Sequence, residues 1–163
     1  MSRWSANVPT WTPVAVADAT NFTDAGHMSI QGGSTTQFSN VLEVYMGGQA
    51  GASSPSIMLV ARDSVVGVTL SVGRLAALHP STAALTAPPV VFNTASTKPQ
   101  RSATLSLLNL SFNAFGGIVR WVAAPGEELG MLGSTASLGE ISLSAFTGGT
   151  PGLMGSHFIF EPF

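Results

Sequence analysis

The sequence predicts an all-β protein: a single-domain antiparallel β-sandwich or jelly roll of about eight short strands with extended termini. Apolar residues recur mainly with a two-residue period, which is typical of strands, and a helical period is rare. The 10 Pro and 18 Gly are spread along the chain and interrupt any helix before it reaches four turns. The 163 residues suffice for one domain with a buried core.

In the first half of the chain, alternating segments predict two short extended pieces, at residues 13–16 and 28–30, and then strands at residues 37–46, 56–61 and 64–72. The last two are expected to form a hairpin around Arg62 and Asp63. Residues 47–55 are small and polar, which indicates a mobile loop. Residues 73–85 have room for one helical turn at most, because His79 and Pro80 end it.

The second half is expected to contain strands at the following places: residues 90–93, 101–117, 118–123, 138–146 and 157–161. Lys98 and Pro99 indicate a turn or crossover loop before the strand at residues 101–117. Residues 124–127, Ala-Pro-Gly-Glu, predict a β-turn, because Pro fixes φ at the second position and Gly relieves the third.

The stretch RSATLSLLNLSFNAFGG, residues 101–117, fills every gap between its apolar residues with Ser, Thr or Asn. Leu105 and Leu107 have one parity, whereas Leu108 and Leu110 have the other, so a regular strand cannot point all of them at one core. One explanation is a one-residue bulge near Leu107 and Leu108. The other is that both faces are covered, one by a second sheet and one by a neighbouring subunit.

Charge is the most unusual feature of the composition. Charged residues make up 9% of the chain, against about 25% in a typical domain. The 20 Ser, 15 Thr and 18 Gly occupy polar positions instead. With a net charge of −2 and scattered cations, the chain lacks a basic field for phosphates, so we expect no direct nucleic-acid binding.

Cysteine is absent, which excludes a disulfide scaffold and a Cys-ligated zinc site. The first residues lack the apolar run of a secretory signal, and the apolar runs elsewhere are too short to span a bilayer. The expectation is therefore a chain that is not exported by its own sequence and has no membrane partner.

Catalytic signatures are missing. The chain has no G-x-S-x-G elbow, and His27, His79 and His157 lack the close spacing of a metal site. Glu127 and Glu128 are interpreted as a solvated loop tip, and the glycine pairs as turn residues. We expect no catalytic residue, cofactor or metal, and no enzymatic activity.

Aromatic residues cluster near both ends of the chain. Residues 1–12 are expected to form an N-terminal arm, and residues 13–163 a β-sandwich domain with a C-terminal aromatic tail. Chain ends with little charge are expected to dock, either onto their own domain or across a subunit boundary as exchanged arms. The residues assigned to a subunit or capsid interface on this basis are Trp4, Trp11, Phe158, Phe160 and Phe163.

An N-terminal extension, SRWSANVPTWTPVAV, precedes Ser/Thr/Gly/Ala-rich strands with few charges and no Cys. In this overall character the chain resembles small virion structural proteins of tailed bacteriophages, of the head decoration or cement type. The resemblance implies a β-sandwich or β-barrel-like subunit, commonly a homotrimer, that binds a major capsid protein on the exterior of an icosahedral head. Such a subunit stabilises the contacts between major capsid subunits and is assembled in the cytoplasm of the bacterial host. Uncharged Ser, Thr and Ala faces suit such contacts, because they avoid the desolvation cost of burying ions.

A second hypothesis is a carbohydrate-binding or host-recognition β-sandwich module of a phage tail or fibre. Such a module would show exposed aromatic platforms beside Asp, Asn and Arg. Trp121, next to Arg120, is the internal candidate, although a place in the core explains Trp121 more simply.

Overall fold

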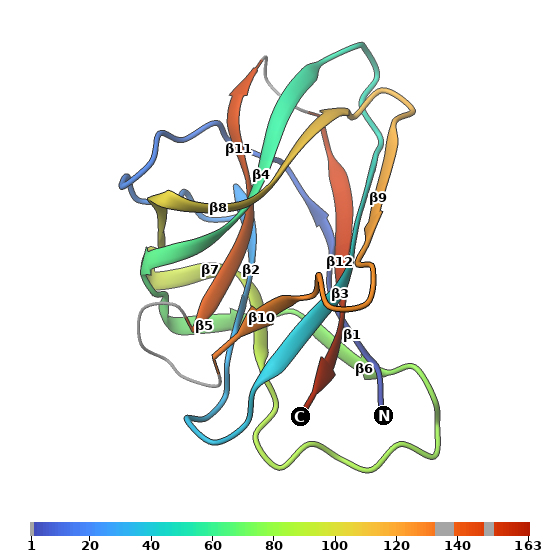
Figure 1. The fold of residues 1–163 in the computed structure, drawn as a ribbon. Helices are drawn as coiled ribbons and strands as arrows, with labels where there is room; N and C mark the ends of the chain where they lie inside the picture. Colours follow the sequence, from blue (N-terminus) through green and yellow to red (C-terminus); the bar gives the residue numbers. More distant parts are fainter. Residues whose placement is uncertain (1, 133–138, 149–151) are drawn as a thin grey trace.

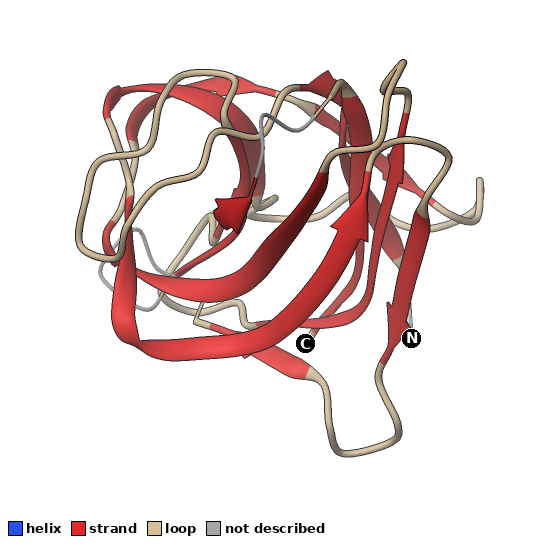
Figure 2. Cartoon of the chain, turned by 90° about the horizontal axis from the view of Figure 1, so that it is seen from above, coloured by secondary structure: helices blue, strands red, loops and turns tan. Residues whose placement is uncertain are grey.

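The computed structural model describes residues 2–132, 139–148 and 152–163, and these residues form an all-β sandwich without helices (Figures 1 and 2). No helix in these ranges could therefore cross a membrane. The strands are β1 Trp4–Trp11, β2 His27–Gln31, β3 Ser39–Gly48, β4 Pro55–Val65, β5 Val68–Val72, β6 Arg74–Ala77, β7 Val90–Thr97, β8 Gln100–Asn113, β9 Ile118–Val122, β10 Leu129–Met131, β11 Glu140–Gly148 and β12 Met154–Pro162.

The strands form two antiparallel sheets of six. Sheet A has the order β10-β3-β12-β1-β6, and β9 pairs with β3 beside β10. Sheet B has the order β5-β7-β2-β11-β4-β8. Figure 1 shows the sheets facing each other, and Figure 2, seen from above, shows their strands curving around the interior. The predicted fold class is confirmed, with twelve strands rather than eight.

The strand count differs for local reasons. Residues 1–12 were expected to be an arm, but β1 lies between β12 and β6 inside sheet A, so this segment is part of the sandwich. Residues 74–77 form strand β6 instead of a helical turn, because pairing with β1 outweighs the helical preference of Leu and Ala. Strand β10 was not predicted, and residues 13–16 are not a strand.

The predicted hairpin around Arg62 and Asp63 is wrong. Strand β4 continues through both residues and pairs with β8 and β11, whereas β5 pairs with β7. Asp63 therefore lies inside a strand and not in a turn. Its side chain is fully buried, and its Oδ1 accepts a hydrogen bond from the Ser142 hydroxyl at 2.7 Å. The chain leaves β4 two residues later, at residues 66–67.

The predicted bulge in β8 is confirmed. Val60 of β4 pairs with Leu108, and the next residue, Ala61, pairs with Ser106, so Leu107 is the extra residue. The bulge allows Leu107 and Leu108 to pack against the same core, although they are adjacent in sequence.

The main core lies between the two sheets. Sheet A contributes aromatic and apolar residues of its central strands. Sheet B contributes every second residue of β2, β4 and β11. The fully buried members with the largest side chains include Trp11, Phe158, Phe160, Met28, Ile30, Met58, Ile141 and Leu143.

Sheet B is also buried on part of its other face. Residues 12–26 cross this face and are held by backbone hydrogen bonds from Val16 N to Ala145 O at 3.1 Å and from Ala19 N to Arg101 O at 2.9 Å. We call the covered side chains the second buried layer. Its polar members are His27, Ser29, Gln31, Asp63, Arg101, Glu140, Ser142 and Ser144, and its apolar members include Phe22, Leu59, Ala61, Phe92 and Ala95.

Candidate functional site

Three of the five residues assigned to an interface lie inside their own chain. Trp11, Phe158 and Phe160 belong to the core between the sheets, and the two Phe side chains are completely buried. The Trp11 indole donates a hydrogen bond to the Ser156 hydroxyl at 2.8 Å. Their assignment to an interface is therefore corrected: β1 and β12 pair along their length, which makes the ends of the chain the centre of sheet A.

The other two residues of this set lie nearer the surface. Trp4 is half-buried and packs against the core from β1. Phe163 is 66% exposed and stacks on Phe38, with ring centroids 5.9 Å apart. The backbones of Phe38 and Phe163 exchange two hydrogen bonds, at 3.0 and 3.2 Å, which fix this aromatic pair in place.

An apolar pocket of about 390 Å³ adjoins the Phe38–Phe163 pair. Gly130, Met131 and Leu132 line it together with the two rings, and Leu132 is itself exposed. Arg62, half-buried, supplies the one cationic group among the lining residues, and burial lowers the pKa of its guanidinium below the usual value. Aromatic walls with one cation could receive an apolar side chain or an acidic group.

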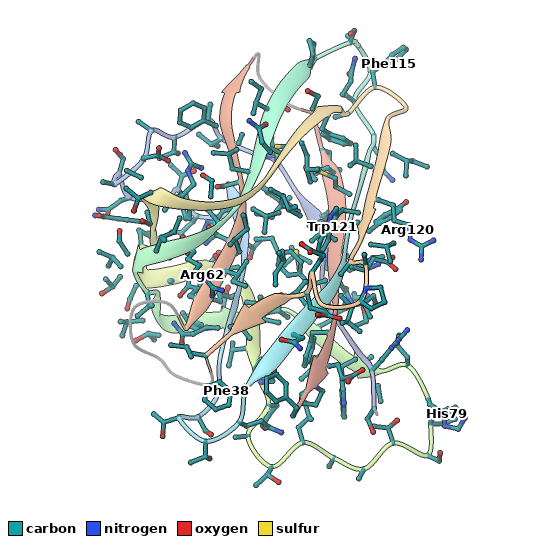
Figure 3. The ribbon with its side chains drawn as sticks, viewed as in Figure 1. Phe38, Arg62, His79, Phe115, Arg120 and Trp121 are labelled. Atoms are coloured by element: carbon teal, nitrogen blue, oxygen red, sulfur yellow. The ribbon has the colours of Figure 1, made fainter. Side chains whose placement is uncertain are left out.

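The outer face of sheet A carries a second cluster. Tyr45 and His157, cross-strand partners on β3 and β12, stack with ring centroids 4.8 Å apart and planes 11° apart. Glu43 accepts a hydrogen bond from Arg120 at 2.7 Å and lies 3.5 Å from His157 Nε2. The hydrogen bond from Arg120 is the main cause that lowers the pKa of Glu43. Figure 3 shows Arg120 pointing away from the molecule.

A trough of about 360 Å³ lies beside Tyr45. Five glycines line it, together with Thr10, Gln49 and Ile118; the glycines are Gly47, Gly48, Gly116, Gly117 and Gly155. A side chain at Gly48 would lie 2.3 Å from the Ala114 backbone, so the strand and the neighbouring loop approach closely only because residue 48 is glycine.

Trp121 is not part of this exposed cluster. Its side chain packs against the core between the sheets and points inward in Figure 3. The interpretation of Trp121 as a core residue is confirmed, and the aromatic residues on the outer face, Tyr45 and His157, were not predicted. Their signal was weak because Tyr45 and His157 are far apart in sequence and meet only through strand pairing.

The second buried layer contains an arginine with no solvent exposure. Arg101 Nε lies 2.5 Å from Asp18 Oδ1, and its Nη1 donates to the Ser144 hydroxyl at 2.7 Å. Its Nη2 donates to the Val16 carbonyl. The charge is thus bonded to segment 12–26, to β11 and to one carboxylate, which is what a buried guanidinium requires.

Asp63 and Glu140 are the two buried carboxyl groups of the second buried layer. Glu140 Oε2 accepts hydrogen bonds from Gly67 N at 2.8 Å and from Gln31 Nε2 at 2.9 Å, so it fixes the turn between β4 and β5. Burial and the neighbouring Glu140 raise the pKa of Asp63 well above 3.8, and burial also raises the pKa of Glu140. Because two buried carboxylates repel each other, the pair titrates as a unit and holds a proton to a higher pH than an ordinary carboxyl group does.

His27 is the third ionisable group of this layer. Its Nδ1 donates to the Thr23 carbonyl at 3.1 Å, and its ring stacks on Phe22 with centroids 4.9 Å apart. Burial lowers the pKa of His27 from 6.5 to about 4. The imidazole is therefore neutral in the folded chain at neutral pH, and it serves as a packed core residue.

The other ionisable residues do not assemble into a site. His79 lies in an exposed loop, where its Nδ1 is 2.7 Å from the Ser81 hydroxyl. Residues 124–127 form the predicted turn, with a hydrogen bond from Glu127 N to Ala124 O and Gly126 at φ +89°. Within residues 2–132, 139–148 and 152–163, no three His, Asp or Glu side chains cluster as metal ligands would.

The geometry defines a β-sandwich with exposed apolar and aromatic surfaces. Comparisons with protein-family models, with curated proteins and with solved structures find no match to this chain.

Proposed function

We propose that the chain is a structural subunit of a protein assembly, specifically a decoration protein that binds the major capsid protein on the outside of an icosahedral phage head. One observation carries the proposal: an exterior poor in ions that exposes large apolar side chains. Only 9% of the residues are charged, and Phe163, Ile118, Val122 and Phe115 are each more than half exposed. Where exposed apolar side chains lie together, as those of Phe38 and Phe163 do, they mark a surface that another molecule can cover.

The Phe38–Phe163 pair and its pocket are the surface that we assign to the capsid. Aromatic side chains supply much of the binding energy of protein interfaces when a partner excludes water around them. Here two rings are held rigidly by backbone hydrogen bonds next to an apolar pocket with one arginine. A capsid loop with an exposed apolar side chain would fit this surface.

Mixing the purified chain with expanded heads that lack decoration tests the proposal. We expect saturable addition, measured by co-sedimentation, and at least tenfold weaker binding for Phe163→Ser. Phe115→Ser is the matched control, since Phe115 is 55% exposed at the opposite end of the molecule (Figure 3). No addition of the wild-type chain to heads, or equal losses for both variants, would contradict the proposal.

A second candidate is saccharide binding at the outer face of sheet A. The observation that favours it is the Tyr45–His157 stack beside the glycine-lined trough, with Glu43 and Arg120 next to it. Sugar rings stack on aromatic faces and hydrogen-bond to neighbouring polar groups. Glycan-array binding by the isolated chain that Tyr45→Ala abolishes, without addition to heads, would favour this candidate over decoration.

A further inference from the structure

We propose that the free edge of strand β8 pairs with the same edge of a second copy of this chain, in an antiparallel ladder about a two-fold axis. The inference goes beyond the proposed function, because the contact would form whatever the assembly binds. It favours an even number of subunits over the trimer that the resemblance implies.

Strand β8 is the last strand of sheet B, and β4 is its one partner among the strands that the structure describes. Its first residue, Gln100, also forms an isolated bridge with Asn21. The beginning of its outer edge is covered by residues 19–22, through hydrogen bonds from Ala19 N to Arg101 O and from Phe22 N to Pro99 O. Beyond this point the outer edge has no neighbouring strand among the described residues. Its backbone groups can therefore accept another strand.

Beyond Arg101, the sequence of β8 lacks the charges and prolines that protect many edge strands. Natural edges are commonly blocked by Lys, by other charges or by Pro. Between Arg101 and Arg120 the sequence contains neither a charged residue nor a proline. The bulge at Leu107 interrupts the first part of the strand, whereas residues 108–113 pair in regular register with residues 55–60 of β4. The regular segment is the one that can template a further strand.

The segment LNLSF, residues 108–112, is self-complementary when it is paired about Leu110. In this register Leu110 faces its own symmetry mate, Leu108 faces Phe112, and Asn109 faces Ser111. Leu108, Leu110 and Phe112 pack toward the core, and Asn109 and Ser111 are exposed on the opposite face. Apolar residues thus meet apolar residues on one face, and hydrogen-bonding residues meet each other on the other.

The missing charges also indicate that the occupant is a second copy. A two-fold axis places each side chain opposite its own kind or a close sequence neighbour, so a charged edge would repel itself. An uncharged edge carries no such penalty, and it offers a foreign partner no charge to recognise. Half-exposed Leu108 and Leu110 would lose solvent contact in the pair.

Two double variants at exposed positions test the contact and its register. Asn109→Lys with Ser111→Lys places two lysines opposite each other across the axis, whereas Asn109→Glu with Ser111→Lys places Glu opposite Lys. Sedimentation-equilibrium masses over a range of concentrations give the dimer dissociation constant, and circular dichroism verifies that each variant is folded. We expect a dimer for the wild type, at least tenfold weaker dimerisation for the two-lysine variant, and recovery in the Glu/Lys variant.

A wild type that stays monomeric at high concentration, or a mass that is an odd multiple of the subunit, would overturn the inference. Equal dimerisation of the wild type and the two-lysine variant would overturn it as well. Head binding is measured separately: a two-lysine monomer that still binds heads leaves decoration intact, and a dimer that does not bind heads removes decoration but not the β8 contact.

Discussion

The two sheets differ in what covers their outer faces. The outer face of sheet A is open to solvent and carries the Tyr45–His157 stack with the Glu43–Arg120 ion pair, in which Arg120 is 61% exposed. Part of the outer face of sheet B is covered by residues 12–26, and Arg101, which lies beneath this segment, has no exposed side-chain area. The same alternation of small polar and apolar residues therefore places polar side chains in solvent in sheet A and in the second buried layer in sheet B.

The difference shows where the few charges of this chain contribute most to folding. An exposed ion pair adds little to stability, because water screens it and the side chains lose freedom. A buried charge must have partners, and the loss of one partner leaves the others unpaired in a poorly polarisable interior. Ionic groups in sheet B are thus expected to affect stability strongly, and those in sheet A weakly.

Replacing Arg101 is the largest single-residue test of this comparison. Arg101→Met retains most of the side-chain volume but removes the hydrogen bonds to Ser144 and Val16 and the ion pair with Asp18. We expect the free energy of unfolding to fall by about 3–5 kcal/mol, as for other broken buried pairs. Urea denaturation followed by tryptophan fluorescence measures the change.

Arg120→Met is the matched control on sheet A. It breaks an ion pair with a 2.7 Å contact to Glu43, but at an exposed position, so we expect a much smaller loss of stability than for Arg101→Met. If both substitutions lowered the free energy of unfolding by similar amounts, burial of Arg101 in the second layer would not make it more important for stability than the exposed Arg120.

His27 tests the same layer through pH. Its pKa of about 4 in the folded chain lies below the ordinary 6.5, so the folded state favours the neutral ring. Its contribution is complete above pH 6.5 and is lost as the pH falls toward 4, by about 3 kcal/mol at about 1.4 kcal/mol per pKa unit. We expect His27→Gln to remove this loss between pH 7.5 and 4.5. An imidazole that titrates near 6.5 by NMR would contradict the burial argument.

Sequence patterns predicted the parts of the fold that depend on local chemistry. The two-residue period identified most strands, the Pro-Gly pair identified the turn at residues 124–127, and the conflicting parities in β8 identified the bulge at Leu107. Strand β1 was interpreted as an arm, because its partners β12 and β6 lie far away along the chain. No local signal distinguishes a terminal strand inside a sheet from a docked arm.

The candidate surfaces were harder to predict than the fold. A serine between apolar residues is expected on an exposed face, and nothing in EISLSAF indicates that Ser142 and Ser144 are buried. Arg62 and Asp63 suggested a turn for a similar reason, since charged residues are rarely buried without partners. The partners of Asp63, Ser142 and Glu140, come from a strand almost 80 residues away.

The Asp63–Glu140 pair gives a prediction about the direction in which stability changes with pH. Because the pKa of Asp63 is raised above 3.8, its contribution to stability is complete below pH 3.8 and is lost as the pH rises through the folded-state pKa. Asn at position 63 has no proton to lose, and its amide can donate to Glu140 and accept from Ser142 as the protonated acid does. We therefore expect Asp63→Asn to be more stable than the wild type at pH 8 and to show less dependence on pH.

Asp24→Asn is the control of opposite sign. The hydrogen bond from Lys98 to Asp24 lowers the pKa of this largely exposed carboxyl, so its contribution is present above pH 3.8 and is lost below it. Removing the charge should destabilise the chain slightly at pH 8 and less at pH 3. Unfolding free energies of both variants at the two pH values separate the cases. A destabilised Asp63→Asn variant at pH 8 would show that the pair is ionised and held by Arg101, which would make the second buried layer an ordinary ion-pair network.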